Sequence, residues 1–302
     1  MKHSLSLLTI IILISACGNN PEKSGDTKAL VQTADTIMQP ELHTELYGNY
    51  VGYFVDGRTD DEQMKSDVYI DPVKISIQIM RITDKGADGR SVVRGNGRPM
   101  TGKLTQAGNN YKFVMDEPGN DKHDGRFNFS IHGDSLIGIW ESYDPTVKGP
   151  KKKFTLIKIP FQYNANLMLP EEEWEYVDWE KSKHVSELYI NEDGTKDTIV
   201  NEFYRSASKA VYTINASKQT LTEKQLKNLK KLDLEIIRNT IFARHGYAFK
   251  SRGVRQFFDG VEWYIPVSTD VQGELSQTEK DNIALLKRFE KYAQDNYDTF
   301  GR

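Results

Sequence analysis

Hydrophobic and polar residues alternate along much of the first half of the chain, a period of two that predicts β-strands. The clearest strand runs from Val73 to Ile79, where Lys74, Ser76 and Gln78 separate aliphatic residues. Eight such segments follow one another without a helical pattern between them: 50–55, 73–79, 90–94, 101–106, 111–115, 126–131, 136–143 and 153–159. Because an up-and-down barrel closes at about eight antiparallel strands, we predict a barrel-like domain over residues 46–161.

A helical period replaces this alternation near the C-terminus. Two capping-box patterns, Thr222–Gln225 and Ser276–Glu279, each predict the start of a helix. Between them we predict a helix that Asp233 caps and Gly246 ends, and a short helix over residues 251–260. The sequence therefore predicts a small all-helical domain over residues 221–302 and an α+β fold for the chain.

The segment between the two predicted domains, residues 162–220, combines acidic and aromatic side chains. Three glutamates follow Pro170, and Trp174, Tyr176 and Trp179 come next. Aromatic side chains of this size seldom stay exposed, so we expect them to pack on the barrel or on the helical domain. We interpret the segment as an ordered bridge.

The chain opens with a basic residue and a short apolar run that ends at its one cysteine, Cys17. The run is too short for a hydrocarbon core of about 30 Å, which needs roughly 20 apolar residues. Residues 1–16 therefore have the pattern of a cleaved signal peptide. An ordinary secretory signal with a chance cysteine is the alternative to the interpretation that follows.

Ile14–Cys17 resembles the lipobox of bacterial lipoproteins, in which the cysteine is acylated and becomes the mature N-terminus. The resemblance implies a membrane anchor at Cys17, with residues 17–45 as lipidated cysteine and flexible tether. Gly18 stands where an aspartate would favour the inner membrane, so we expect the outer membrane. No acidic run follows the cysteine, which favours the periplasmic side and leaves surface exposure open.

Composition and motifs argue against several functions. The formal net charge of −3 gives no polybasic footprint for nucleic acid. If the one cysteine is acylated, disulfides and thiol chemistry are excluded, and the scattered histidines predict no metal site. Without a recognisable catalytic motif, we expect no cofactor and no enzymatic activity. A hydrolase whose carboxylate pair forms only on folding is an alternative.

Residues 241–247, IFARHGY, resemble the YARHG family, a bacterial extracytoplasmic domain of about seventy residues. The resemblance continues through Phe249, Phe257–Phe258 and Trp263–Tyr264 to the helix at Ser276. It implies a helical fold and an envelope location, and it implies no reaction.

The same region holds the candidate binding residues. No acidic residue lies between Glu235 and Asp259, although several cations do, and such a segment favours an anionic partner. The candidates are Arg238, Arg244, His245, Lys250, Arg252, Arg255, Trp263 and Tyr264. We expect peptidoglycan or another envelope protein as the partner. Arg244 and His245 also suit a structural place at a helix C-terminus, and acidic residues elsewhere could neutralise the segment.

A second functional hypothesis places a small apolar ligand inside the barrel, as in lipocalin-like carriers. The likeness to lipocalins is limited to strand count and order, because the Gly138–Trp140 string lies in the seventh predicted strand. A barrel filled by its own side chains is the alternative.

Overall fold

The computed structural model describes residues 39–60, 71–171, 176–295 and 297–298. The predicted signal peptide, Cys17 and most of the predicted tether lie outside the described residues, as does Trp174. The described residues from Gln39 onward form one compact unit that contains both the barrel and the helical domain. Within the described ranges, no helix is long and apolar enough to cross a membrane.

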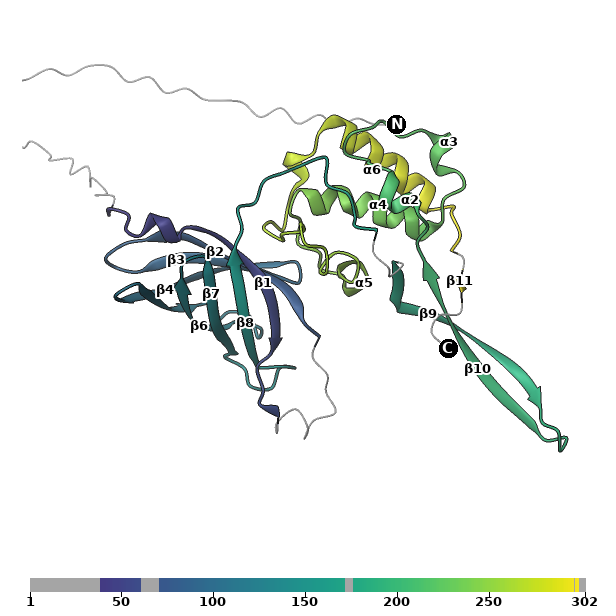
Figure 1. Ribbon diagram of the computed structural model, residues 1–302, viewed down its shortest axis with the longest axis horizontal. Helices are drawn as coiled ribbons and strands as arrows, with labels where there is room; N and C mark the ends of the chain where they lie inside the picture. Colours follow the sequence, from purple (N-terminus) through teal and green to yellow (C-terminus); the bar gives the residue numbers. More distant parts are fainter. Residues whose placement is uncertain (1–38, 61–70, 172–175, 296, 299–302) are drawn as a thin grey trace, which may run out of the picture. The chain divides into compact units, whose positions relative to one another are not determined.

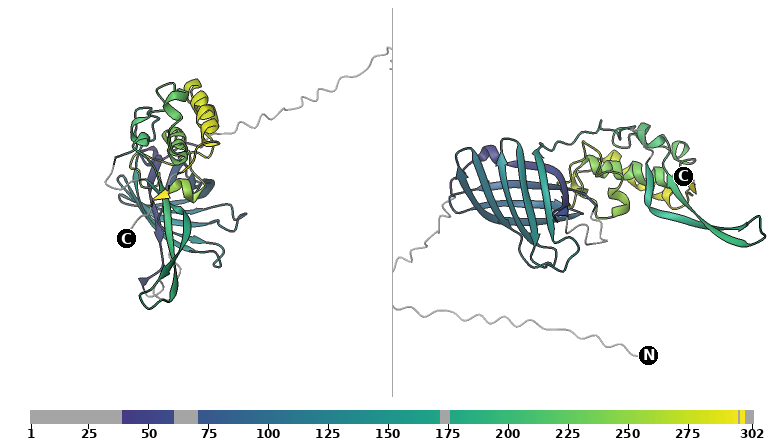
Figure 2. Two further views of the ribbon diagram at one scale, coloured as in Figure 1. Left: turned by 90° about the vertical axis from the view of Figure 1, so that its right-hand side faces the viewer. Right: turned by 60° about the horizontal axis from the view of Figure 1, so that its bottom comes forward.

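Eight antiparallel strands form a closed barrel (Figures 1 and 2). Each strand pairs with the next in sequence, and the eighth pairs with the first. The strands are β1 (Gly48–Asp56), β2 (Val73–Ile82), β3 (Ala87–Val93), β4 (Asn96–Ala107), β5 (Asn110–Asp116), β6 (Gly125–His132), β7 (Ser135–Ser142) and β8 (Lys151–Lys158). The predicted barrel and the predicted α+β fold are confirmed.

Aliphatic and aromatic side chains fill most of the barrel interior. The Phe113 and Phe129 rings stack with their centroids 4.9 Å apart, and the Phe54 and Phe154 rings lie 5.5 Å apart. Burying a ring of this size stabilises the fold by roughly 1.5–3 kcal/mol. At one end, the 3₁₀ turn η1 (Thr44–Leu46) places a buried leucine under the strands. The described interior is therefore mostly filled with side chains, and an open cavity lies at the opposite end.

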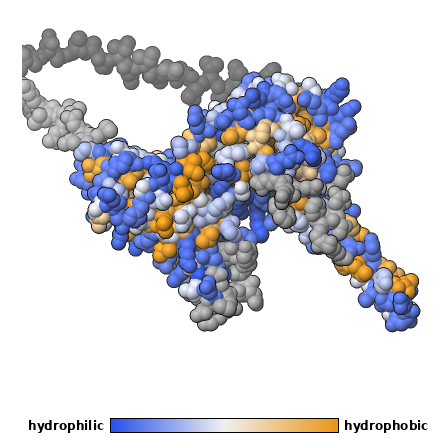
Figure 3. Space-filling view, in the orientation of Figure 1, coloured by the Kyte–Doolittle hydropathy of each residue, from blue (hydrophilic) through white to orange (hydrophobic). Residues whose placement is uncertain are grey.

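A long β-hairpin follows the barrel, in a segment for which the sequence predicts no strand. Its strands are β9 (Val177–Ile190) and β10 (Lys196–Ser206), and β11 (Tyr297–Asp298) pairs with the base of β10. Apolar side chains such as Leu188 are exposed toward its end (Figure 3). Most side chains of the hairpin are exposed on both faces, so its sequence lacks the alternation that burial of one face imposes.

The C-terminal region is a small helical domain with short β additions. Its elements are α2 (Ala210–Thr213), α3 (Glu223–Leu226), α4 (Lys231–Arg244), α5 (Arg252–Arg255), η2 (Gln272–Glu274) and α6 (Gln277–Glu290). Gly246 adopts φ +70° after α4, the left-handed conformation that ends many helices. The prediction that Asp233 is the N-cap of α4 is wrong, because Lys230 occupies that position. Asp233 lies in the first turn of the helix, and its carboxylate accepts a hydrogen bond from the Lys230 backbone N–H at 3.1 Å.

Several polar contacts join the helical domain to the barrel. The Lys74 ammonium donates to the Val261 carbonyl oxygen at 2.6 Å, and the Tyr53 hydroxyl donates to the Asp259 carbonyl oxygen at 2.6 Å. Arg252 forms an ion pair with Asp71 at 2.8 Å. These contacts place α5 beside one end of the barrel.

Candidate functional site

Two of the predicted binding residues lie in the interior of the helical domain. Arg244 is only 2% exposed, and its guanidinium donates to the Leu167 carbonyl oxygen at 2.7 Å and to the Ser217 hydroxyl at 3.0 Å. His245 lies 3.0 Å from the Glu279 carboxylate and is also buried. The structure therefore gives both residues internal partners, as the structural interpretation expects.

The other four predicted cations differ in their exposure and in their ion-pair partners. Arg238 pairs with Glu290, and Arg255 pairs with Asp259 at 3.3 Å. The remaining arginine, Arg252, contacts the carboxylates of Asp71 and Glu180 at 2.8 and 3.0 Å. Lys250 is exposed. All three of these arginines therefore form ion pairs with acidic side chains.

The two aromatic candidates also make internal contacts. The Trp263 indole donates to the Met168 carbonyl oxygen at 2.8 Å, and the buried Tyr264 donates to the Tyr247 carbonyl oxygen at 2.8 Å. Of the eight predicted residues, Lys250 and Arg252 keep an exposed side chain. The structure does not bring the eight together on one open surface.

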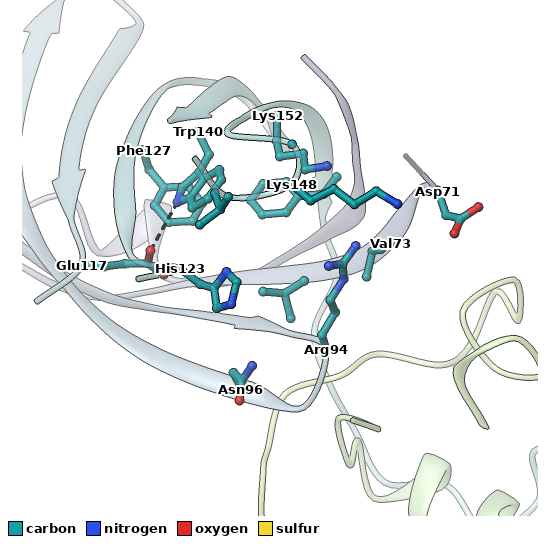
Figure 4. A pocket seen from close by; sticks show the side chains of 14 residues that line it. Asp71, Val73, Arg94, Asn96, Glu117, His123, Phe127, Trp140, Lys148 and Lys152 are labelled. Carbon is teal, nitrogen blue, oxygen red and sulfur yellow. Dashed lines mark hydrogen bonds between the residues drawn. The ribbon is translucent and has the colours of Figure 1, made fainter. Parts of the chain in front are cut away.

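An open cavity of about 210 Å³ lies instead at the mouth of the barrel (Figure 4). The side chains of Phe54, Phe127 and Trp140 form its apolar floor, and their ring centroids are 5.9 to 6.4 Å apart. A cavity of about 150 Å³ accommodates benzene, so this space suits one substituted ring. The cavity lies opposite the end that η1 closes.

Three cations line the same cavity: Arg94, Lys148 and Lys152. Their charged ends gather on one side of it, away from Glu117 (Figure 4). Lys152 is 7% exposed. Within the described part of the chain, none of the three side chains has an ion-pair or hydrogen-bond partner. Burial, followed by the nearby charge of Arg94, lowers the pKa of Lys152 to about 8.

The backbone at Arg94 is unusual. Arg94 and Gly95 form the turn between β3 and β4 with φ angles of +52° and +75°. Such turns favour Asn-Gly, because a side chain with a bulky Cβ substituent is strained at positive φ. An arginine in this conformation costs roughly 1–2 kcal/mol. Strain of this kind is found at functional sites more often than elsewhere.

One carboxylate, Glu117, lies at the inner wall of the cavity. It accepts hydrogen bonds from the Ser91 hydroxyl at 2.8 Å, from the Gly125 backbone at 2.8 Å and from the Trp140 indole at 3.3 Å. Burial raises the pKa of Glu117. The contacts fix the carboxylate and the Trp140 ring that forms part of the floor. Across the described ranges, no group of three His, Cys, Asp or Glu side chains is placed to hold a metal ion.

The three cavity cations, Arg94, Lys148 and Lys152, are not among the residues predicted from the sequence. One signal was present for Lys152, which shares the inward alternation of Phe154 and Leu156 in β8. No comparable signal marks Arg94 or Lys148, because both lie in loops that only the closed barrel brings together.

Comparison with known families identifies the C-terminal part of the chain. Residues 209–291 match the YARHG domain, which agrees with the resemblance seen in the sequence and indicates an envelope-associated protein. The match covers the helical domain and leaves the barrel outside. No curated protein and no solved structure matches the chain.

Proposed function

We propose that the mouth of the barrel binds a small organic anion that carries an apolar ring. The observation that supports this proposal is Lys152, a lysine that is 7% exposed and whose ammonium has no ion-pair or hydrogen-bond partner in the described structure, in the lining of a cavity with an aromatic floor. Partial removal of a charge from water is costly, and an anionic ligand would offset this cost by forming an ion pair with the ammonium.

The shape and the charge of the cavity suit such a ligand better than a purely apolar one. Phe54, Phe127 and Trp140 offer the surface on which a ring can pack, and the space limits the ligand to about one ring. Arg94 and Lys148 add two more cations on the same side as Lys152. The cation side would hold a carboxylate or phosphate group, and the floor would hold the ring.

We also propose that the site binds its ligand without transforming it. Glu117 is the buried carboxylate of the cavity, and its two oxygens already accept three hydrogen bonds. These contacts suit a structural acceptor that holds Trp140 and the loop before β6. A hydrolase would instead need a carboxylate free to reach the ligand. Release of product from a bound ester would favour that alternative.

Three probes of similar shape and different charge test the binding proposal. Calorimetric titration of the full chain should show binding of benzoate and no binding of benzylamine, with benzyl alcohol much weaker than benzoate. Lys152→Met should weaken benzoate binding at least tenfold. Lys153→Met is the matched control, because Lys153 is the next residue of β8 and its side chain is exposed. Equal binding of the three probes, or equal loss in both variants, would contradict the proposal.

The place of this binding site in the cell is a further part of the proposal. An extracytoplasmic helical domain and the lipobox-like Ile14–Cys17 support an acylated protein of the outer membrane that faces the periplasm. In fractionated cells, Cys17→Ser should move the protein from membranes to the soluble fraction. Sedimentation of that variant with envelope lipids at high salt would argue against the anchor.

A second candidate function is contact with peptidoglycan or another envelope protein. Lys250 and Arg252 support it, because their exposed side chains lie at the edge of the helical domain near the barrel mouth. Wild-type protein should then sediment with purified sacculi at low salt and less so at high salt. Lys250→Glu should reduce this sedimentation, and the exposed Lys224→Glu should not. Absence of sedimentation at low salt would remove peptidoglycan as the partner.

A further inference from the structure

The cavity at the barrel mouth continues into a cleft beside the helical domain. This cleft has a volume of about 470 Å³ and shares Arg94, Lys148 and Lys152 with the mouth. Its other wall is formed by α5, from which Arg252 and Arg255 contribute side chains. A ligand seated at the mouth can therefore reach the helical domain without leaving the cleft.

Close packing holds α5 against the barrel. A Cβ atom built on Gly95 would lie 2.7 Å from the Cα atom of Lys250, so a larger residue does not fit in that turn. The Tyr53 hydroxyl donates a hydrogen bond to the carbonyl oxygen of Asp259, which lies in the turn that follows α5. The same turn that carries Arg94 is thus in direct contact with the residues before α5.

The acidic residues of the cleft form ion pairs with the arginines of α5. Asp71 and Glu180 both contact Arg252, and Asp259 contacts Arg255. Asp71 also lines the mouth, but among the described residues Arg94, Lys148 and Lys152 form no ion pair with it or with another carboxylate. In addition, the Nε atom of Arg255 is buried and has no hydrogen-bond partner there.

We propose that the ligand is a phosphate ester whose phosphate group lies in the cleft between Lys152 and Arg255. This assignment rests on the proposed anion binding at the mouth and names the chemical class of the anion. A carboxylate supplies one negative charge, whereas a phosphate monoester carries about −1.5 to −2 at neutral pH and offers three strong acceptor oxygens. Three cations that form no ion pair and an arginine Nε–H that makes no hydrogen bond match the larger charge and the larger number of acceptors.

A comparison of phenyl phosphate with benzoate tests the assignment, because the two probes share one ring and differ in the anionic group. The full chain should bind phenyl phosphate at least tenfold more tightly than benzoate. Arg255→Lys keeps the charge and removes the Nε–H, so it should lower the ratio of the two affinities. Arg288→Lys, an exposed arginine of α6 that pairs with Glu223 outside the cleft, should leave the ratio unchanged.

The wild-type comparison requires no variant to fold, and it separates the two proposals. Binding of benzoate and phenyl phosphate with equal affinity would overturn the phosphate assignment and leave anion binding intact. A wild-type ratio that Arg255→Lys does not lower would also overturn it. Absence of binding by both probes would overturn the proposed function itself.

Vesicles distinguish a lipid phosphate from a soluble ester. Phosphatidylcholine vesicles with and without phosphatidic acid would be mixed with the Cys17→Ser chain, so that a lipid anchor cannot contribute. Sedimentation that requires phosphatidic acid and is competed by phenyl phosphate would identify a lipid headgroup. Binding of phenyl phosphate without such sedimentation would identify a soluble ester.

Discussion

Lys152 shows how a single residue can depart from the pattern that forms its own strand. In β8 the inward positions alternate with exposed residues such as Lys151 and Lys153, and Lys152 occupies an inward position on the same side as Phe154. The alternation thus predicts its burial, although the run Lys151–Lys153 resembles a solvated end of a strand. Buried lysines are rare without a partner. The inward position of Lys152 in the alternating pattern was therefore the feature of the sequence that could have indicated a binding site.

The burial of Lys152 predicts a conflict between stability and binding. Its pKa in the folded state is lowered from 10.5 to about 8, so the proton is held less well there than in the unfolded chain. At pH 7 the charged group therefore destabilises the fold, and this cost disappears as the pH rises above about 8 toward 10.5.

Lys152→Met should therefore raise the free energy of unfolding at pH 7 by on the order of 1–3 kcal/mol, while it weakens benzoate binding at least tenfold. Urea unfolding of wild type, Lys152→Met and the exposed control Lys153→Met measures this directly. A loss of stability specific to Lys152→Met would show that the ammonium already has a stabilising role in the free protein.

At the scale of elements, Glu279 joins parts of the chain that are distant in sequence. It accepts a hydrogen bond from the Ser276 backbone at 2.9 Å, lies beside His245 at the end of α4, and accepts a hydrogen bond from the Tyr163 hydroxyl at 3.0 Å. The Tyr163 and His245 rings stack 4.2 Å apart. The sequence predicted the capping box at Ser276, but not that its glutamate would fasten the segment after the barrel to the helical domain.

This cluster should make stability depend on pH in the acid range. Burial alone would raise the pKa of Glu279, but hydrogen bonds from His245 and the Ser276 backbone outweigh it and lower the pKa to about 2. A lowered carboxyl pKa contributes stability above the ordinary value of 4.5, and that contribution is lost as the pH falls toward 2.

Glu279→Gln should consequently lower the free energy of unfolding at pH 7 by on the order of 2–3 kcal/mol. The difference between the variant and the wild type should shrink between pH 4.5 and pH 2. Thermal unfolding at several pH values measures it, and Glu274→Gln on an exposed turn serves as the control. An equal difference at pH 7 and pH 2.5 would show that the ionised carboxylate is not the stabilising group.

The β9–β10 hairpin marks the limit of element prediction from this sequence. Its base is fixed by Arg205, which contacts Asp178, Glu235 and Asp295 at 2.8, 2.9 and 3.0 Å. These partners come from three separate parts of the chain, and their meeting follows from tertiary structure. By contrast, the barrel strands and the main helices bury one face each. This burial gives their hydrophobic residues a period of two in the strands and of 3.6 in the helices, which the sequence shows.

At the scale of the whole molecule, the sequence indicates both domains but not the site at their edge. The strand count predicts a barrel, and IFARHGY indicates the helical domain that the family comparison confirms. The cavity cations come from two loops and one strand, and Arg255 comes from the other domain. Their convergence depends on barrel closure and on contacts such as Lys74 with Val261, which no local pattern encodes.

The titration of Lys152 tests the central claim, that the barrel mouth binds an organic anion. Two lysines, Lys152 and Lys74, have a pKa lowered to about 8, in each case first because of burial. Lys74 bonds to the helical domain on the outside of the barrel, so it provides an internal control. Charged groups that act on Lys152 are Arg94, Asp56, Arg58 and Lys148.

NMR titration of lysine side chains labelled at Cε would follow both groups, and Lys152→Met would assign the signal. In the free protein Lys152 should titrate near pH 8, and saturating benzoate should raise its pKa because a bound anion favours the protonated form. The signal of Lys74 should not move. A Lys152 that titrates like an exposed lysine, or whose pKa is unchanged by benzoate, would contradict the account.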